Sequence, residues 1–209
     1  MIKNIIFDYG DIFINLDKAA TNRELHKLGI DDFTPEMIAI NQTYEKGLIS
    51  TEEFVNFYHE QFPNTTKEAL IDAWNAILLD FPKHRMEFIK QLAKDNKYRL
   101  FILSNTNDLH ISWIQEDWGM ELYTEFKNCF EQFYLSHEIH FRKPDAAIYE
   151  FVLNENKLKA EETIFIDDTT ENTESAATLG IHVWNLIPGF EDIVDLFTNK
   201  KSLFLFTLS

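Results

Sequence analysis

Residues 2–10 read IKNIIFDYG, an apolar run that closes on Asp8 and Gly10. An apolar run of this length, bounded by an acid and a glycine, is typical of a buried strand that ends in a turn. In open α/β sheets, ligands bind at the carboxyl ends of the strands. The sequence therefore places Asp8 where such a sheet carries its chemistry, beside a glycine that lets a ligand approach the backbone.

Further apolar runs predict the rest of this sheet. They cover residues 98–104, 132–136, 163–168 and 181–186, and helical patterns at 145–156 and 171–179 separate the later ones. Strands that alternate with helices favour a parallel sheet with right-handed crossovers. We therefore predict an α/β fold with a Rossmann-like, three-layer parallel sheet.

Residues 16–82 break this rhythm, because they carry helical patterns and no convincing strand. Within them, Ser50 and Glu53 have the spacing of a capping box that opens a helix. We predict an α-helical domain at 16–82, inserted into a core domain formed by 1–15 and 83–209. The apolar tail at 200–206 suits either an added strand or a docked segment.

Composition and charge argue against several kinds of partner and location. The 209 residues carry a formal charge of −16, which argues against nucleic acid or an anionic membrane surface as a partner. The single cysteine, Cys129, cannot form an intrachain disulfide. The start of the chain does not resemble a signal peptide, and no apolar stretch approaches the length of a membrane span. We expect a cytoplasmic protein, either a monomer or a weak homodimer.

Polar groups follow four of the predicted strands. Asp8 ends the first strand, Ser104 and Asn105 end the second, Lys143 lies in the loop after the third, and Asp168 ends the fourth. In a parallel sheet these positions fall on one edge. Together they supply a carboxylate nucleophile, phosphate donors, a cation and a second carboxylate, which is a complete set for phosphoryl transfer.

The acidic groups predict a covalent mechanism with a metal ion. Asp8 can attack phosphorus and form an aspartyl phosphate, which divides one hard step into two easier ones. Two anions repel each other, so a cation is required. Asp8, Asp168 and the backbone carbonyl of Gly10 are oxygen ligands of the kind that Mg²⁺ prefers.

The remaining groups predict a phosphate site. The hydroxyl of Ser104 and the amide of Asn105 can donate hydrogen bonds to phosphate oxygens. Lys143 can neutralise the charge that builds in the transition state.

The motifs around these residues resemble those of the haloacid dehalogenase superfamily. They are FDYG at 7–10, LSNTN at 103–107, RKP at 142–144 and FIDD at 165–168, and their order and spacing agree over almost the whole chain. The predicted insertion lies where that family has a small α-helical cap. Within the superfamily, the chain is most similar to bacterial sugar-phosphate phosphatases of the α-D-glucose-1-phosphate phosphatase type.

The resemblance implies roles for individual residues. Asp8 would be the nucleophile, and Lys143 would be the cation. Ser104 and Asn105 would bind the phosphate. Asp168 would bind Mg²⁺, and Asp167 and Asn172 would support that site. Most phosphatases of the superfamily also carry a second Asp two positions after the nucleophile, as general acid and base, where this chain has Gly10. Asp11 is the candidate substitute. Without positioned acid–base help such a site should be about 10²–10⁴-fold slower.

These observations favour a Mg²⁺-dependent phosphatase of a small phosphorylated metabolite, such as a sugar phosphate. A metal-independent 2-haloacid dehalogenase is a second hypothesis, which the adjacent acids Asp167 and Asp168 disfavour. A non-catalytic binding or regulatory protein is a third, and Gly10 is its only support. Residues 44–46 are candidates for substrate selection, and His110 is interpreted as a structural residue in preference to one on the rim of the site.

Overall fold

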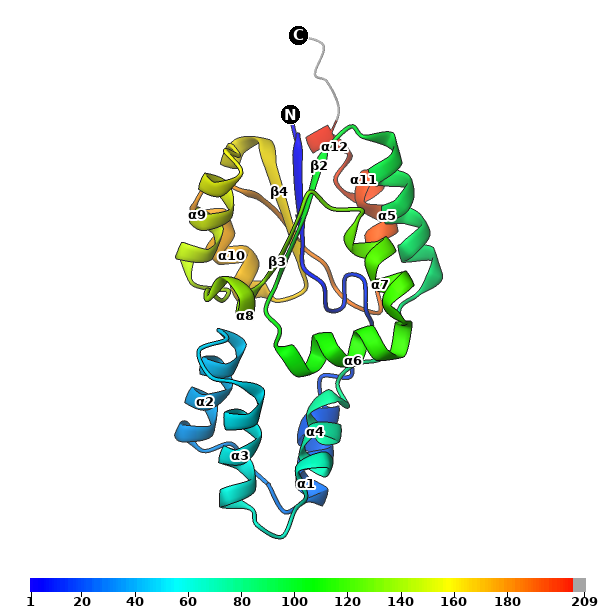
Figure 1. The fold of residues 1–209 in the computed structure, drawn as a ribbon. Coiled ribbons are helices and arrows are strands. Elements are labelled where there is room, and N and C mark those ends of the chain that lie inside the picture. The colour runs from blue at the N-terminus through cyan, green and yellow to red at the C-terminus, as the bar shows by residue number, and fades with distance from the viewer. Residues whose placement is uncertain (205–209) are drawn as a thin grey trace.

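The computed structural model describes residues 1–204, and a five-stranded sheet forms its centre (Figure 1). The strands are β1 (Asn4–Phe7), β2 (Arg99–Ser104), β3 (Gln132–Leu135), β4 (Thr163–Asp167) and β5 (His182–Asn185). All neighbours pair in parallel, in the order β3-β2-β1-β4-β5. The predicted parallel α/β sheet is confirmed, with strands somewhat shorter than the apolar runs.

Helices cover both faces of the sheet (Figure 1). On one side lie α9 (Ala146–Glu155) and α10 (Thr170–Thr178); on the other lie α5 (Lys83–Asp95), α7 (Met120–Lys127) and α11 (Leu196–Asn199). Successive strand residues alternate between the two layers: Ile6 belongs to the cluster under α9, whereas Ile5 and Phe7 belong to the cluster under α5 and α7. Burial on both faces explains why these strands are continuous apolar runs.

Four helices between β1 and α5 pack around a hydrophobic cluster of their own, below the sheet in Figure 1. They are α1 (Ala20–Lys27), α2 (Pro35–Glu45), α3 (Thr51–Gln61) and α4 (Lys67–Asn75), called here the inserted helices. The capping box at the start of α3 is confirmed: the Ser50 hydroxyl accepts from the Glu53 amide at 3.2 Å, and the Glu53 carboxylate accepts from the Ser50 amide at 2.8 Å.

The remaining elements connect the layers. They are α6 (Asp108–Trp118), α8 (Ser136–Ile139), the 3₁₀ turns at Ala160–Glu162 and Ile193–Asp195, and α12 (Lys201–Phe204). In the tail, Phe204 packs against Tyr98 and Phe197. The described part of the tail is thus a docked helical segment and the alternative of an added strand is wrong for it; residues 205 and 206 lie outside the described residues.

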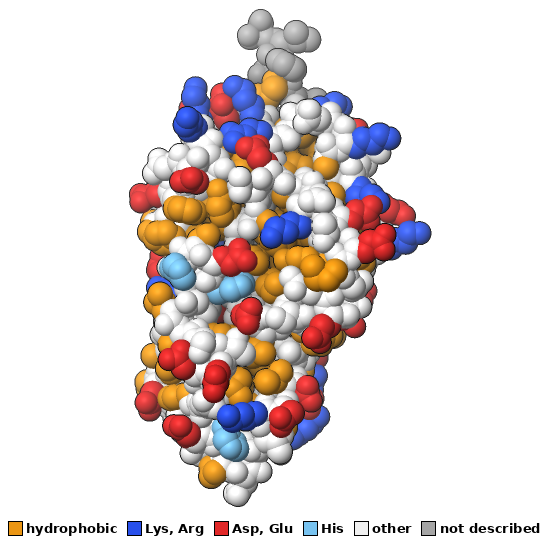
Figure 2. Space-filling view, in the orientation of Figure 1, with side chains coloured by type: hydrophobic (Ala, Val, Ile, Leu, Met, Phe, Trp, Pro, Cys, Tyr) orange, Lys and Arg blue, Asp and Glu red, His pale blue; other side chains and the backbone are white. Residues whose placement is uncertain are grey.

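Acidic side chains are distributed over the visible face of both the sheet layers and the inserted helices, in keeping with the charge of −16 (Figure 2). Among residues 1–204, none of the helices combines the length and the apolar character that a membrane span requires.

Candidate active site

Asp8 lies at the point where the strand order reverses around β1. The register pairs Phe7 with Ile102 on one side and with Ile166 on the other, and the Asp8 amide donates to the Ile166 carbonyl at 2.8 Å. Asp8 therefore emerges at the carboxyl edge between β2 and β4. In open α/β sheets this topological switch point is where ligands bind.

A buried lysine joins the ends of two strands. The Lys143 ammonium donates to Asp8 Oδ1 at 2.7 Å and to Asp167 Oδ2 at 2.6 Å, and its side chain is only 1% exposed. Asp167 also accepts from the side-chain amide of Asn172 at 3.0 Å and from the backbone amide of Thr169 at 2.7 Å. These bonds fix Asp167 as the partner that holds Lys143 against Asp8.

The loop that carries Lys143 is clamped by Asn105. The Asn105 side chain accepts from the Lys143 amide and donates to the Lys143 carbonyl, both at 2.8 Å. Ser104, the last residue of β2, is buried beside it and faces a cavity. The structure thus brings together the strand-end residues that the sequence singled out: Asp8, Ser104, Asn105, Lys143, Asp167, Asp168 and Asn172.

The electrostatics of the cluster reflect an excess of buried negative charge. Burial raises the pKa of Asp8 to about 7; Lys143 opposes this shift, and Asp167 and Asp168 add to it. The single ammonium of Lys143 is shared between two carboxylates, so its short contact with Asp8 does not offset burial and two like charges. Burial lowers the pKa of Lys143, but Asp167 and Asp8 outweigh burial and raise it overall. Lys143 is therefore a permanent cation.

The same charge excess suits a divalent cation. One ligand oxygen from each of Asp8, Asp167 and Asp168 lies within 4.8 Å of the others. Both oxygens of Asp167 already accept hydrogen bonds, whereas Lys143 contacts one oxygen of Asp8 and Lys18 contacts one oxygen of Asp168. Asp8 and Asp168 therefore each retain an oxygen for the ion. Burial raises the pKa of Asp168 as well. Hard oxygen donors with raised pKa values match the chemistry of Mg²⁺.

The loop after β1 places the Leu16 side chain beside Gly10 and holds Asp11. A Cβ at Gly10 would lie 2.6 Å from Cδ1 of Leu16. Asp11 has a left-handed backbone, with φ of 55°, and its Oδ1 accepts from the Leu16 amide at 3.0 Å. Its Oδ1 thus braces this loop, and its Oδ2 lies 3.3 Å from the Lys18 ammonium.

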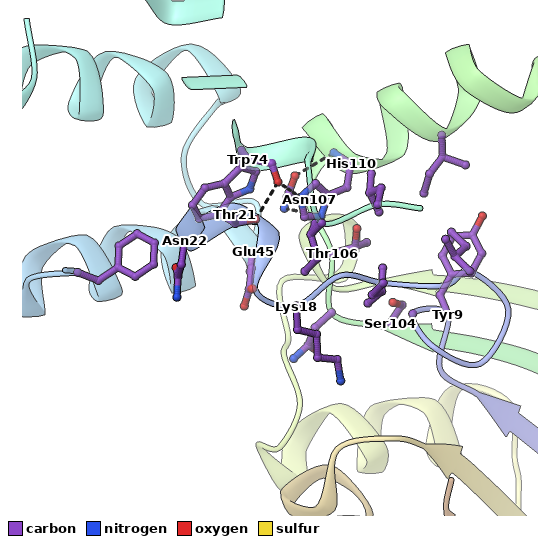
Figure 3. Close-up of a pocket in the computed structure, with 18 residues that line it drawn as sticks. Tyr9, Lys18, Thr21, Asn22, Glu45, Trp74, Ser104, Thr106, Asn107 and His110 are labelled. Atoms are coloured by element: carbon purple, nitrogen blue, oxygen red, sulfur yellow. Dashed lines mark hydrogen bonds between the residues drawn. The ribbon is translucent and has the colours of Figure 1, made fainter. Parts of the chain in front are cut away.

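A cavity of about 290 Å³ lies between the strand ends and the inserted helices (Figure 3). The sheet side contributes Ser104 and Lys18, and the helices contribute Asn22, Glu45 and Trp74. The walls also include apolar side chains: Ile14, Leu16, Phe33, Ile77, Leu78 and Ile114. A small organic group therefore fits between the strand ends and the inserted helices.

His110 lines this cavity as a neutral side chain. Its Nε2 donates to the Trp74 carbonyl at 3.2 Å, and its Nδ1 accepts from the Asn107 side chain at 3.3 Å. Burial lowers the pKa of His110 to about 4. The imidazole thus links α6 to α4, as the favoured structural interpretation expected, and it also lies at the wall of the cavity.

The turn after α2 docks on the sheet layers and separates the three residues at 44–46. Glu45 lines the cavity and accepts from Arg142 at 2.9 Å. The Tyr44 hydroxyl is buried and accepts from the Leu109 amide at 3.1 Å, and Lys46 pairs with Asp145 at 3.4 Å. Of these three, the described cavity lining includes Glu45 alone.

Lys18 is the site residue that the sequence analysis missed. Its ammonium donates to Asp168 and lies 3.3 Å from Asp11 Oδ2, and its side chain lines the cavity. No spacing rule points to a lysine ten residues after a nucleophile. Its position depends on the course of the loop from β1 to α1, which local sequence patterns do not specify.

Comparisons with known proteins agree with this geometry. A family of haloacid dehalogenase-like hydrolases matches residues 5–186. D-ribitol-5-phosphate phosphatase from Bacteroides thetaiotaomicron is 26% identical over 190 residues, which cover 88% of this chain and 91% of that protein.

Solved structures are similar over nearly the whole chain. A HAD family enzyme from Bacteroides thetaiotaomicron in complex with magnesium is 32% identical, with a TM-score of 0.83 over 94% of this chain and 98% of that one. The same wild-type enzyme in complex with magnesium and inorganic phosphate is also 32% identical, with a TM-score of 0.80 over 94% and 100%. A predicted HAD-like family hydrolase from Porphyromonas gingivalis is 26% identical, with a TM-score of 0.83 over 99% and 100%.

Proposed function

The chain belongs to the haloacid dehalogenase-like hydrolases, and we propose that it is a Mg²⁺-dependent phosphatase that cleaves a small phosphomonoester through an aspartyl phosphate on Asp8. The observation that carries this proposal is the contact of the buried Lys143 ammonium with both Asp8 and Asp167 at the carboxyl edge of the sheet. The relatives named for a phosphatase and for complexes with magnesium and phosphate support it.

The reaction follows from the placement of these side chains. A carboxylate oxygen of Asp8 attacks phosphorus while the ester P–O bond breaks, and its electron pair leaves with the alcohol oxygen. Ser104 and the Asn105 amide donate to the phosphoryl oxygens, and Lys143 balances the negative charge from the nucleophile side. Water then attacks the aspartyl phosphate, which releases inorganic phosphate and regenerates Asp8.

Asp8, Asp168 and the carbonyl of Gly10 would hold Mg²⁺. The bound ion would offset the repulsion between the Asp8 carboxylate and the substrate phosphate, which Lys143 alone does not remove.

We further propose that the inserted helices, within residues 16–82, act as a cap that encloses the alcohol part of the substrate. The cavity between them and the strand ends is small, and Glu45 offers acceptors for hydroxyl groups. The indole N–H of Trp74 is buried and has no hydrogen-bond partner within residues 1–204, so it can donate to another hydroxyl. Sugar and sugar-alcohol phosphates are therefore the substrates to test first, and the name of the curated relative supports that choice.

A panel of phosphomonoesters tests the proposal. The wild-type protein should hydrolyse at least one sugar or sugar-alcohol phosphate with Mg²⁺ present and lose that activity with a chelator. Asp8→Asn should lower kcat by at least about 10³-fold, because the nucleophile is lost. Asp31→Asn, the same change at an exposed aspartate, serves as the matched control.

Three results would count against it. Turnover of no phosphoester would favour a non-catalytic protein. Equal rates for Asp8→Asn and wild type would remove Asp8 from the mechanism. Hydrolysis of a 2-haloacid that survives the chelator would favour the dehalogenase.

A further inference from the structure

The site raises the question of what stabilises the leaving oxygen. Gly10 offers no acid, and Leu16 occupies the space into which a side chain at that position would extend. Both carboxylate oxygens of Asp11 are engaged: Oδ1 accepts from the Leu16 amide and Oδ2 lies 3.3 Å from the Lys18 ammonium. His110 donates its Nε2 proton to the Trp74 carbonyl. None of these side chains places a free donor beside the alcohol oxygen.

Lys18 lies on the side of the cluster that faces the cavity. It is the only lysine or arginine among the described residues that line the cavity, and Figure 3 shows it between Glu45 of the inserted helices and Ser104 of the sheet edge. Lys143, by contrast, is buried behind Asp8 and is held by two carboxylates. The two lysines therefore flank the reaction centre, Lys143 on the nucleophile side and Lys18 on the substrate side.

Two anchors hold the Lys18 ammonium in this place. Asp168 accepts a hydrogen bond from it, and Asp11 Oδ2 lies 3.3 Å away. Asp11 is itself fixed by its bond to the Leu16 amide. With side-chain exposure of 53%, Lys18 keeps freedom to turn toward a substrate while Asp11 limits its range.

We propose that Lys18 is a catalytic residue that stabilises negative charge on the leaving oxygen. This proposal rests on the proposed phosphatase function. As the bond from Asp8 to phosphorus forms and the ester P–O bond breaks, the electron pair stays on the alcohol oxygen. The Lys18 ammonium donates a hydrogen bond to that oxygen, which takes its proton from water, so Lys18 stays charged throughout. Asp11 is a positioning residue for Lys18.

The dependence of rate on the leaving group tests this role. An alkyl phosphate releases a basic alkoxide that needs stabilisation, whereas p-nitrophenyl phosphate releases a phenolate that needs little. Lys18→Met should lower kcat for the alkyl ester by about 10²-fold, the usual effect of removing one donor to a developing oxyanion. The aryl ester should lose less than about 5-fold, because its leaving group is already stable. Lys18→Arg should recover most of the alkyl activity.

Controls separate this role from others. Lys27→Met removes an exposed lysine of α1 and should leave both rates as in wild type. Thermal unfolding of each variant reports on folding, and calorimetric titration with Mg²⁺ reports on the metal site.

Equal losses on both esters would overturn the proposal and assign Lys18 to phosphate binding. A change in Mg²⁺ affinity with the ratio of the two rates unchanged would overturn it in favour of a role at the metal site. If wild type cleaves neither ester, the proposed phosphatase function is wrong, and the proposed role of Lys18 is wrong as well. If wild type cleaves both and Lys18→Met keeps their ratio, only the role of Lys18 fails.

Discussion

Asp8 and Lys143 meet at 2.7 Å although 135 positions separate them in the chain. The sequence predicted that both residues lie at the same edge of the sheet, because each follows an apolar strand run and parallel strands end on one edge. Lys18 and the hydrogen bond between Asp11 and the Leu16 amide were not predicted, because both depend on the path of one short loop. Residues that follow the strand ends were thus predictable, and residues whose position depends on the loop from β1 to α1 were not.

His110 gives the molecule a measurable pH dependence. Its pKa falls from 6.5 to about 4 on folding, chiefly through burial. At this site the unfolded chain then binds more protons than the folded one between these values, so the His110 contribution to the free energy of unfolding decreases as the pH drops from 6.5 toward 4. That contribution should change by about 3 kcal/mol. The raised pKa of Asp8 acts in the opposite sense over the same range, because there the folded protein binds the extra proton. Denaturant unfolding across this pH range measures the free energy of unfolding.

His110→Gln removes this contribution, since glutamine does not titrate. The difference in the free energy of unfolding between wild type and His110→Gln should therefore decrease by about 3 kcal/mol as the pH drops from 6.5 to 4. His26→Gln, at an exposed histidine, should show no such change relative to wild type. A difference between wild type and His110→Gln that does not vary with pH would show that His110 does not titrate in this range.

The turn between α2 and α3 is the element that docks the inserted helices on the sheet layers. Its capping box was predictable from the sequence, because the hydrogen bonds of the box join Ser50 and Glu53 to each other, three positions apart. Its docking was not readable. Gly47 approaches the His137 carbonyl so closely that a Cβ would lie 1.9 Å from the oxygen, a contact between segments 90 positions apart. A contact between segments so far apart in the chain produces no periodic pattern in the sequence, so the sequence could not predict it.

Gly47→Ala should therefore weaken this docking. The residue has φ of +62°, so alanine adds backbone strain of about 1–2 kcal/mol to the clash with His137. The turn must withdraw, Glu45 moves with it, and we expect kcat/KM to fall. Steady-state kinetics with denaturant unfolding measures both effects.

Gly29→Ala is the matched control, because Gly29 has φ of +83° and no atom within 4 Å of its Cβ position. Gly29→Ala should lower the free energy of unfolding by the backbone strain alone and leave kcat/KM unchanged. If both variants show the same kinetics, the contact with His137 has no role in the site.

Across the whole molecule, the parallel sheet positions the strand-end residues, and the inserted helices provide walls of the cavity. The sheet order β3-β2-β1-β4-β5 brings the ends of β2 and β4 and the loop after β3 beside Asp8, and the inserted helices border the cavity at these strand ends. The sheet was predictable because its strands are buried on both faces and read as unbroken apolar runs. The cavity was not, because its walls come from segments whose relative position only the folded chain defines.

A covalent phosphate on Asp8 is the central step of the proposed reaction, and a rapid-quench experiment tests it most directly. Wild-type protein is mixed with a ³²P-labelled phosphomonoester that it turns over, in the presence of Mg²⁺, quenched in acid and digested. We predict a label that hydroxylamine releases, located on the peptide that contains Asp8 and absent from Asp8→Asn. Turnover with no labelled protein, or a label on a peptide without Asp8, would contradict the account.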